Sequence, residues 1–161
     1  MKVLLVGVAA LLTAAPATRA PIRIDGVATI RPVSLASDCV RADAADAKVV
    51  ECTGTGSFAG KPRAANAEYS WHWHLFHGGD EPQTAHGDED GILVLQLGAR
   101  GTLRLTTDGS KGPGVSSGTW RYRSGTKQFA KRRGTGTFRF TTVVGGEGWR
   151  SARVVVRGTL R

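Results

Sequence analysis

The segment Trp71–His77 carries the residue types best suited to chemistry in this chain. On a β-strand, alternate side chains point to the same face, so His72 and His74 would lie about 7 Å apart on one face. Two imidazoles at this spacing can reach a single metal ion, and zinc and copper favour such ligands. His77 and His86 could join them from the adjoining segment. The pattern predicts a zinc or copper site on His72, His74 and His86 as one reading of these residues.

The other reading of the same segment is structural. Trp71 and Trp73 alternate with the histidines, so they would point to the opposite face and enter a hydrophobic core while the histidines face solvent. Aromatic residues of later alternating segments would join them in the interior of the fold. We expect these residues to line or plug the interior and to contact a small, partly apolar ligand: Trp71, Trp73, Trp120, Phe138 and Phe140.

Catalytic residues are harder to assign. The chain has neither a Gly-x-Ser-x-Gly elbow nor a phosphate-binding loop, which argues against a serine hydrolase and against a nucleotide-dependent enzyme. A cofactor-free isomerase or cyclase would need a buried acid or base, and Glu51 and Glu68 are the carboxylates that lie on or near apolar segments. Residues 88–91 (Asp-Glu-Asp-Gly) lack the spacing of a calcium loop and are interpreted as a solvated acidic turn. We leave the catalytic residues unassigned and favour a protein without catalysis.

The first twenty residues have the pattern of a secretory signal peptide. Lys2 precedes the apolar run Val3–Ala15, and small residues follow, with cleavage expected after Ala17 or Ala20. The run is shorter than the roughly 20 residues of a membrane-spanning helix, so no transmembrane span is expected in the mature chain. We therefore predict a secreted or periplasmic protein with one domain, residues 21–161.

Two cysteines, Cys39 and Cys52, are present. Export would bring them into an oxidising compartment, where a disulfide between them is expected. They lack the Cys-x-x-Cys spacing of a reactive thiol pair.

The charge is unevenly distributed along the chain. Residues 21–99 carry a net charge of −5 and residues 100–161 a net charge of +12. A basic surface of this kind could attract an anionic envelope polymer or lipid headgroups, whereas nucleic acid is not expected as a partner of an exported protein. Alternatively, the arginines simply occupy the solvent face of strands.

Alternation of apolar and polar residues predicts an all-β fold. Turn residues such as glycine and aspartate separate the alternating runs. Eight strands with short connections favour a single antiparallel β-barrel, because closure removes exposed edges; a two-sheet β-sandwich is the alternative. The predicted strands include Val27–Val33, Val49–Thr53, Tyr69–Leu75, Ile92–Leu97, Thr102–Thr106, Trp120–Tyr122, Phe138–Phe140 and Val154–Val156.

A short glycine–phenylalanine pattern recurs in the chain. Residues 54–60 (GTGSFAG) are echoed by residues 125–131 (GTKQFAK), and residues 134–138 (GTGTF) follow. We interpret each copy as a glycine turn with a buried phenylalanine beneath it. The segment 124–138 resembles the SGTGxFxGxxGxGxF segment of the allene oxide cyclase-like and dirigent-like β-barrels, although Lys127 and Lys131 stand where that pattern has glycine.

This resemblance covers roughly residues 91–160 and implies an eight-stranded antiparallel barrel with a central cavity. It also implies either cofactor-free catalysis on small organic molecules or ligand capture. The catalytic residues of that family do not match positions in this chain. The sequence thus favours an exported β-barrel that binds a small, partly apolar ligand or serves an envelope role, with a metal-binding protein and a cofactor-free isomerase or cyclase as alternatives.

Overall fold

The computed structural model describes residues 19–31, 39–44, 47–77, 86–145 and 148–161. These residues form nine β-strands and two short 3₁₀ turns, with no α-helix among them. No helical segment in these ranges is long and apolar enough to cross a membrane. The elements are β1 (Ile22–Arg31), β2 (Cys39–Ala44), β3 (Ala47–Lys61), β4 (Ala64–His77), β5 (His86–Gln96), η1 (Gly98–Arg100), β6 (Thr102–Gly112), β7 (Val115–Gly125), η2 (Lys127–Phe129), β8 (Gly134–Gly145) and β9 (Gly148–Leu160).

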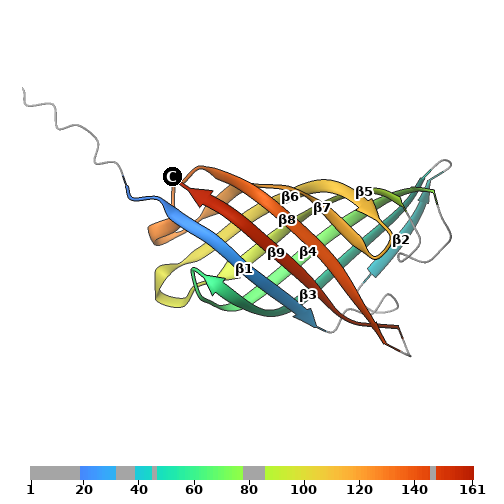
Figure 1. Cartoon of the computed structure of the whole chain (residues 1–161), viewed down its shortest axis with the longest axis horizontal. Coiled ribbons are helices and arrows are strands. Elements are labelled where there is room, and N and C mark those ends of the chain that lie inside the picture. The colour runs from blue at the N-terminus through green and yellow to red at the C-terminus, as the bar shows by residue number, and fades with distance from the viewer. Residues whose placement is uncertain (1–18, 32–38, 45–46, 78–85, 146–147) are drawn as a thin grey trace, which may run out of the picture.

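The strands close into one antiparallel barrel (Figure 1). Strands β3 to β9 pair in chain order, and β1 pairs with both β9 and β3, so eight strands complete the ring. The expected barrel is confirmed, and the sandwich is not formed. Strand β2 pairs with the first half of β3, and β1 pairs with the second half. Strands β2 and β1 therefore follow one another along the same edge of β3.

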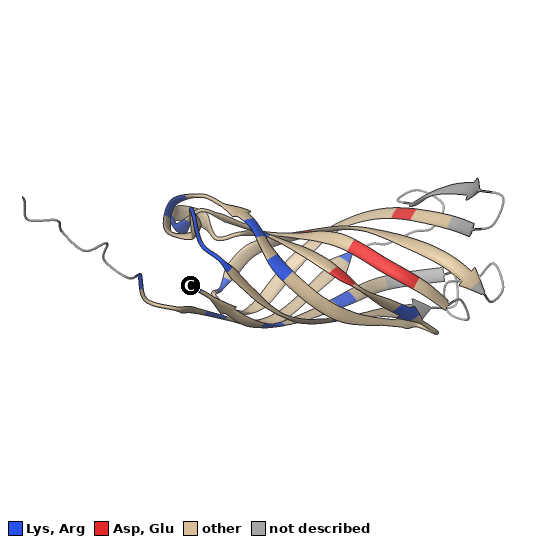
Figure 2. Cartoon of the chain, turned by 90° about the horizontal axis from the view of Figure 1, so that it is seen from above, with Lys and Arg blue, Asp and Glu red and all other residues tan. Residues whose placement is uncertain are grey.

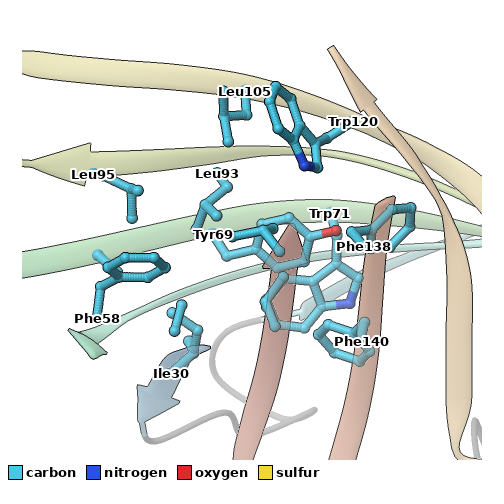
Figure 3. Close-up of a cluster of buried hydrophobic side chains, with 14 of the residues drawn as sticks. Ile30, Phe58, Tyr69, Trp71, Leu93, Leu95, Leu105, Trp120, Phe138 and Phe140 are labelled. Carbon is cyan, nitrogen blue, oxygen red and sulfur yellow. The ribbon is translucent and has the colours of Figure 1, made fainter. Parts of the chain in front are cut away.

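Alternation separates most of the interior of the barrel from its outside, although Val94 on β5 is also buried, between Leu93 and Leu95. On β4, Tyr69, Trp71 and Trp73 are completely buried, whereas His72 and His74 between them are partly exposed. The same alternation on the other strands gives a core of aliphatic and aromatic side chains and an outer surface of threonine, serine and charged residues. Figure 3 shows how Tyr69, Trp71 and Phe140 converge in this core.

The three glycine–phenylalanine segments identified in the sequence adopt different backbone structures. Residues 125–129 do form a turn around η2, with Phe129 fully buried beneath it, as expected. The interpretation of residues 54–60 and 134–136 as turns is wrong, because both lie within strands β3 and β8. The reason is close packing between neighbouring strands: a Cβ on Gly136 would collide with the carbonyl oxygen of Arg157 and lie 2.5 Å from Nε1 of Trp120, the residue paired with Gly136. Gly136 thus makes room for the Trp120 ring, and Gly56 and Gly60 make room for the backbone of β1.

Because neighbouring strands are antiparallel, successive connections alternate between the two ends of the barrel. The β3–β4, β5–β6 and β7–β8 connections lie at one end, with the start of β1 and the end of β9. At this end the backbones of Arg133 and Arg161 hydrogen-bond to each other. At the opposite end, the turn at Gly112–Val115 joins β6 to β7.

Candidate functional site

The acidic run at residues 88–91 is part of strand β5, so its interpretation as a solvated turn is wrong. Alternation turns Glu89 into the barrel, where it is completely buried, while Asp88 and Asp90 on either side are exposed. A buried carboxylate is costly unless it is hydrogen-bonded or paired with a cation. The partners of Glu89 therefore define the most unusual polar site in the described interior.

Two aromatic side chains of β4 hold the Glu89 carboxylate. The Tyr69 hydroxyl donates to Oε1 at 2.7 Å, and the Trp73 indole N–H donates to Oε2 at 2.8 Å. The Tyr69 oxygen is also 2.8 Å from Oγ1 of Thr107. Gly91 makes this contact possible, since a Cβ at that position would lie 2.9 Å from both the Tyr69 and the Thr107 oxygens.

Lys111 is the buried cation next to this carboxylate. Its side chain is only 3% exposed, its ammonium lies 5.2 Å from the centroid of the Trp73 ring, and it also donates to the carbonyl oxygen of Gly112. Trp73 thus contacts both charges, through its N–H toward Glu89 and through its ring face toward Lys111. We call Tyr69, Trp73, Glu89, Thr107 and Lys111 the interior polar cluster.

Burial shifts the pKa values of the cluster toward the neutral forms. It raises the pKa of Glu89, although the hydrogen bonds from Tyr69 and Trp73 and the charge of Lys111 oppose the rise. Burial lowers the pKa of Lys111 to about 8, with the charge of Glu89 opposing the fall. Burial and the Glu89 charge raise the pKa of Tyr69 well above its ordinary value. The pKa of the Glu89 carboxyl group and the pKa of the Lys111 ammonium group are thus both shifted toward neutral pH.

The low pKa of Lys111 gives a testable dependence of stability on pH. Between about pH 8 and pH 10 the unfolded chain keeps the Lys111 proton while the folded protein loses it, so the unfolded state binds more protons. Stability should then rise with pH in this window, by at most ~1.4 kcal/mol per unit. Urea unfolding at several pH values measures the slope. Lys111→Met should remove it, and an equal slope in this variant would contradict the assignment.

The aromatic residues expected to contact a ligand lie in the interior, but in two groups. Trp71, Trp73 and Phe140 pack together, with ring centroids 5.1 to 6.0 Å apart, and Tyr69 stacks on Trp71 at 5.3 Å. The Trp71 indole N–H is buried and has no acceptor among the described residues. This group adjoins the interior polar cluster.

Trp120 and Phe138 form the other part of the expected ligand set. Both are buried, and Trp120 lies against Gly136 and Gly158 with its indole N–H donating to the carbonyl oxygen of Arg157 at 3.0 Å. Its polar atom is therefore satisfied by backbone. This environment makes Trp120 a packing residue and leaves the Trp71 group as the better candidate for ligand contact.

The predicted metal ligands His72 and His74 share the outer face of the barrel. His72 Nδ1 is 3.1 Å from one Asp90 oxygen and His74 Nε2 is 3.2 Å from the other. Burial lowers the pKa of His72, but Asp90 and Glu51 outweigh it and raise that pKa above its ordinary value. His86 stands opposite His77, farther along the β4–β5 pair. Within the described ranges, no group of three or more metal-ligating side chains is arranged around a common point.

Glu51 and Glu68 were the candidates for the buried acid or base that the isomerase or cyclase alternative requires, and neither is buried. Both side chains are exposed on the outer face, and Glu51 instead contacts Nε2 of His72 at 3.2 Å. Glu89 was missed because its acidic neighbours suggested a turn. The phase of β5 was the usable signal: counting back in steps of two from Leu95 and Leu93 leads through Gly91 to Glu89 on the same face.

Comparison with known proteins finds no family model and no curated protein that matches the chain. Fold and site by themselves thus define the class: an antiparallel β-barrel of eight strands with a packed aromatic interior and a buried polar cluster.

Within the described chain, Cys39 and Cys52 are directly opposite each other in the β2–β3 pair.

Proposed function

We propose that this protein is an exported β-barrel that binds a small, partly apolar ligand without transforming it. The observation that carries the proposal is the buried Glu89 carboxylate, fixed by Tyr69 and Trp73 in an interior made mostly of apolar and aromatic side chains. Fixed polar groups among aromatic side chains are the usual composition of small-molecule sites, where the apolar wall supplies affinity and the polar groups orient the ligand.

The Trp71 indole N–H, which has no acceptor among the described residues, supports this location. A buried N–H without an acceptor costs about 1 to 3 kcal/mol, and an acceptor atom of a ligand would recover that cost. The ligand class that would match these groups is therefore a compact molecule with an apolar body that contacts Trp71 and Phe140. Its hydrogen-bond acceptor would face the Trp71 N–H, and a donor would suit the Glu89 carboxylate.

Tryptophan fluorescence and native mass spectrometry test the proposal directly. The protein would be titrated with small aromatic and aliphatic alcohols and acids, and a bound molecule should change the emission and add its mass. Glu89→Gln should weaken binding by about tenfold, the value of one charged hydrogen bond, whereas the exposed Glu68→Gln should not. Failure of every probe to bind, or equal effects of the two variants, would overturn the proposal.

A second candidate is a cofactor-free isomerase or cyclase that uses Glu89 for proton transfer. The raised pKa of this buried carboxyl group favours it, because a general acid or base works best when its pKa is near the operating pH. Chromatography of the bound ligand after prolonged incubation separates the two candidates. A change of the ligand that Glu89→Gln abolishes would support the enzyme, and recovery of the unchanged ligand would support the binding protein.

Export and a disulfide form the second part of the proposal. The register opposite Cys52 supports a Cys39–Cys52 bridge, because Cα atoms of directly paired antiparallel residues are about 4.5 to 5.5 Å apart, within the range of disulfides. Alkylation of the denatured protein should label neither cysteine before reduction and both after it. Reduction should lower the free energy of unfolding by about 3 kcal/mol. Labelling without a reductant would contradict the bridge.

A further inference from the structure

In the described part of the chain, the connecting turns and the end of β9 place seven exposed basic side chains at one end of the barrel. They come from every connection at that end and from the end of β9, including two residues from the acidic half of the sequence. Figure 2 shows basic residues on the turns at this end, whereas the acidic residues lie farther along the strands. We call these residues the basic end: Lys61, Arg63, Arg100, Lys127, Lys131, Arg133 and Arg161.

Among the residues that the structure describes, no ion pair with aspartate or glutamate is seen for the basic end. The connecting segments 61–63, 97–101 and 126–133 contain no aspartate or glutamate. The hydrogen bonds seen for these cations go to backbone: Lys127 Nζ donates to the carbonyl oxygen of Ala99 at 3.1 Å, and Arg100 donates to that of Arg63. Asp25, farther along β1, is already paired with Arg23 and Arg157.

Two of these lysines occupy unfavourable backbone positions. Lys127 has a φ of 50° and Lys131 a φ of 56°, in the left-handed region where glycine is much less strained. Strained non-glycine residues often mark functional positions, because selection keeps the side chain despite its cost to folding. Both lysines are exposed, so packing of the core does not require them.

We propose that the basic end docks the barrel on an anionic lipid surface. The cations are spread over separate turns around the rim of the barrel, so a planar array of phosphate headgroups could meet all of them together, whereas a thin polymer would meet those along one line. No large apolar side chain is exposed on these turns, so the contact would be electrostatic and reversible. Docking is independent of the ligand proposed for the interior.

Vesicle sedimentation tests this proposal. The mature protein should bind vesicles of phosphatidylcholine mixed with phosphatidylglycerol but not phosphatidylcholine alone, and salt should release it. Lys127→Gly/Lys131→Gly should weaken binding roughly 30-fold, at about tenfold per 1.4 kcal/mol and about 1 kcal/mol per cation. Because glycine relieves the left-handed strain, this variant should be at least as stable as the wild type, so lost binding would not reflect unfolding.

A matched control separates the basic end from overall charge. Arg139→Gln/Arg153→Gln removes the same charge from exposed positions on the wall of the barrel, farther from that end, and should retain binding. Equal loss in the two double variants would overturn the proposal, as would equal binding to both kinds of vesicle. Release from the vesicles by polyphosphate at equal phosphate concentration would also overturn it, in favour of a soluble anionic polymer.

Discussion

Replacing Glu89 by glutamine should lower the free energy of unfolding by about 3 kcal/mol, one of the largest effects of a single polar substitution in this protein. The amide retains only one acceptor oxygen, so its NH₂ group must face either the Tyr69 hydroxyl or the Trp73 N–H. The substitution also removes the negative charge that favours the protonated form of the buried Lys111. Urea unfolding at neutral pH measures the loss.

A double-mutant cycle assigns this loss to the pair of charges. Glu89→Gln/Lys111→Met should be more stable than the sum of the single substitutions predicts, since the second change removes the ammonium that the first leaves without its carboxylate. Glu68→Gln on the outer face should change stability by less than about 0.5 kcal/mol. Additive single effects would show that the two buried charges are not coupled.

Replacing Gly136 by alanine should destabilise the protein by about 3 kcal/mol, at the upper end of the usual cost of overpacking. The new Cβ would collide with the carbonyl oxygen of Arg157 and lie 2.5 and 2.6 Å from two atoms of the Trp120 indole. The backbone oxygen belongs to a paired strand and cannot move like a flexible side chain. The indole would also lose its hydrogen bond to Arg157 if it shifted.

Thermal unfolding with near-ultraviolet circular dichroism checks this prediction, because the ordered Trp120 ring contributes to that spectrum. Gly114→Ala is a suitable control: its φ of 64° strains the backbone, but no atom lies within 4 Å of the new Cβ. The control should lose only about 1 to 2 kcal/mol and keep the tryptophan signal. If Gly136→Ala were the milder substitution, the packing of Trp120 against β8 would not be rigid.

Much of the fold could be predicted from the alternation of apolar and polar residues in the sequence. Alternation identified parts of eight strands correctly, because each strand has one buried and one solvated face, and a period of two records that difference residue by residue. The segment Trp71–Leu75 is an example: its aromatic residues are inside and its histidines outside. Strand ends were less accessible, since polar and glycine-rich strand ends look like turns, as in residues 88–91 and 54–60.

The candidate site was accessible only in part. Trp71 and Trp73 were identified as interior residues, but Glu89 and Lys111 were not, because a charged side chain usually faces solvent and the phase of β5 was not followed back to Glu89. His72 and His74 were correctly placed on one face, yet their shared partner Asp90 belongs to the next strand. The basic end combines residues of turns that are far apart in the sequence. The net charge of the second half of the chain therefore could not predict which residues form it.

By itself, the sequence determined the all-β class, the alternation of inside and outside, and the strongly basic character of the second half, because these depend on residue type and on a period of two. The tertiary structure decided closure through the β1–β3 pairing, the position of Trp73 opposite Glu89, and the gathering of Lys61 and Arg63 with the basic residues of later turns. Each of these depends on the register between strands. Register follows from how the whole set of side chains packs in the interior, which no local pattern contains.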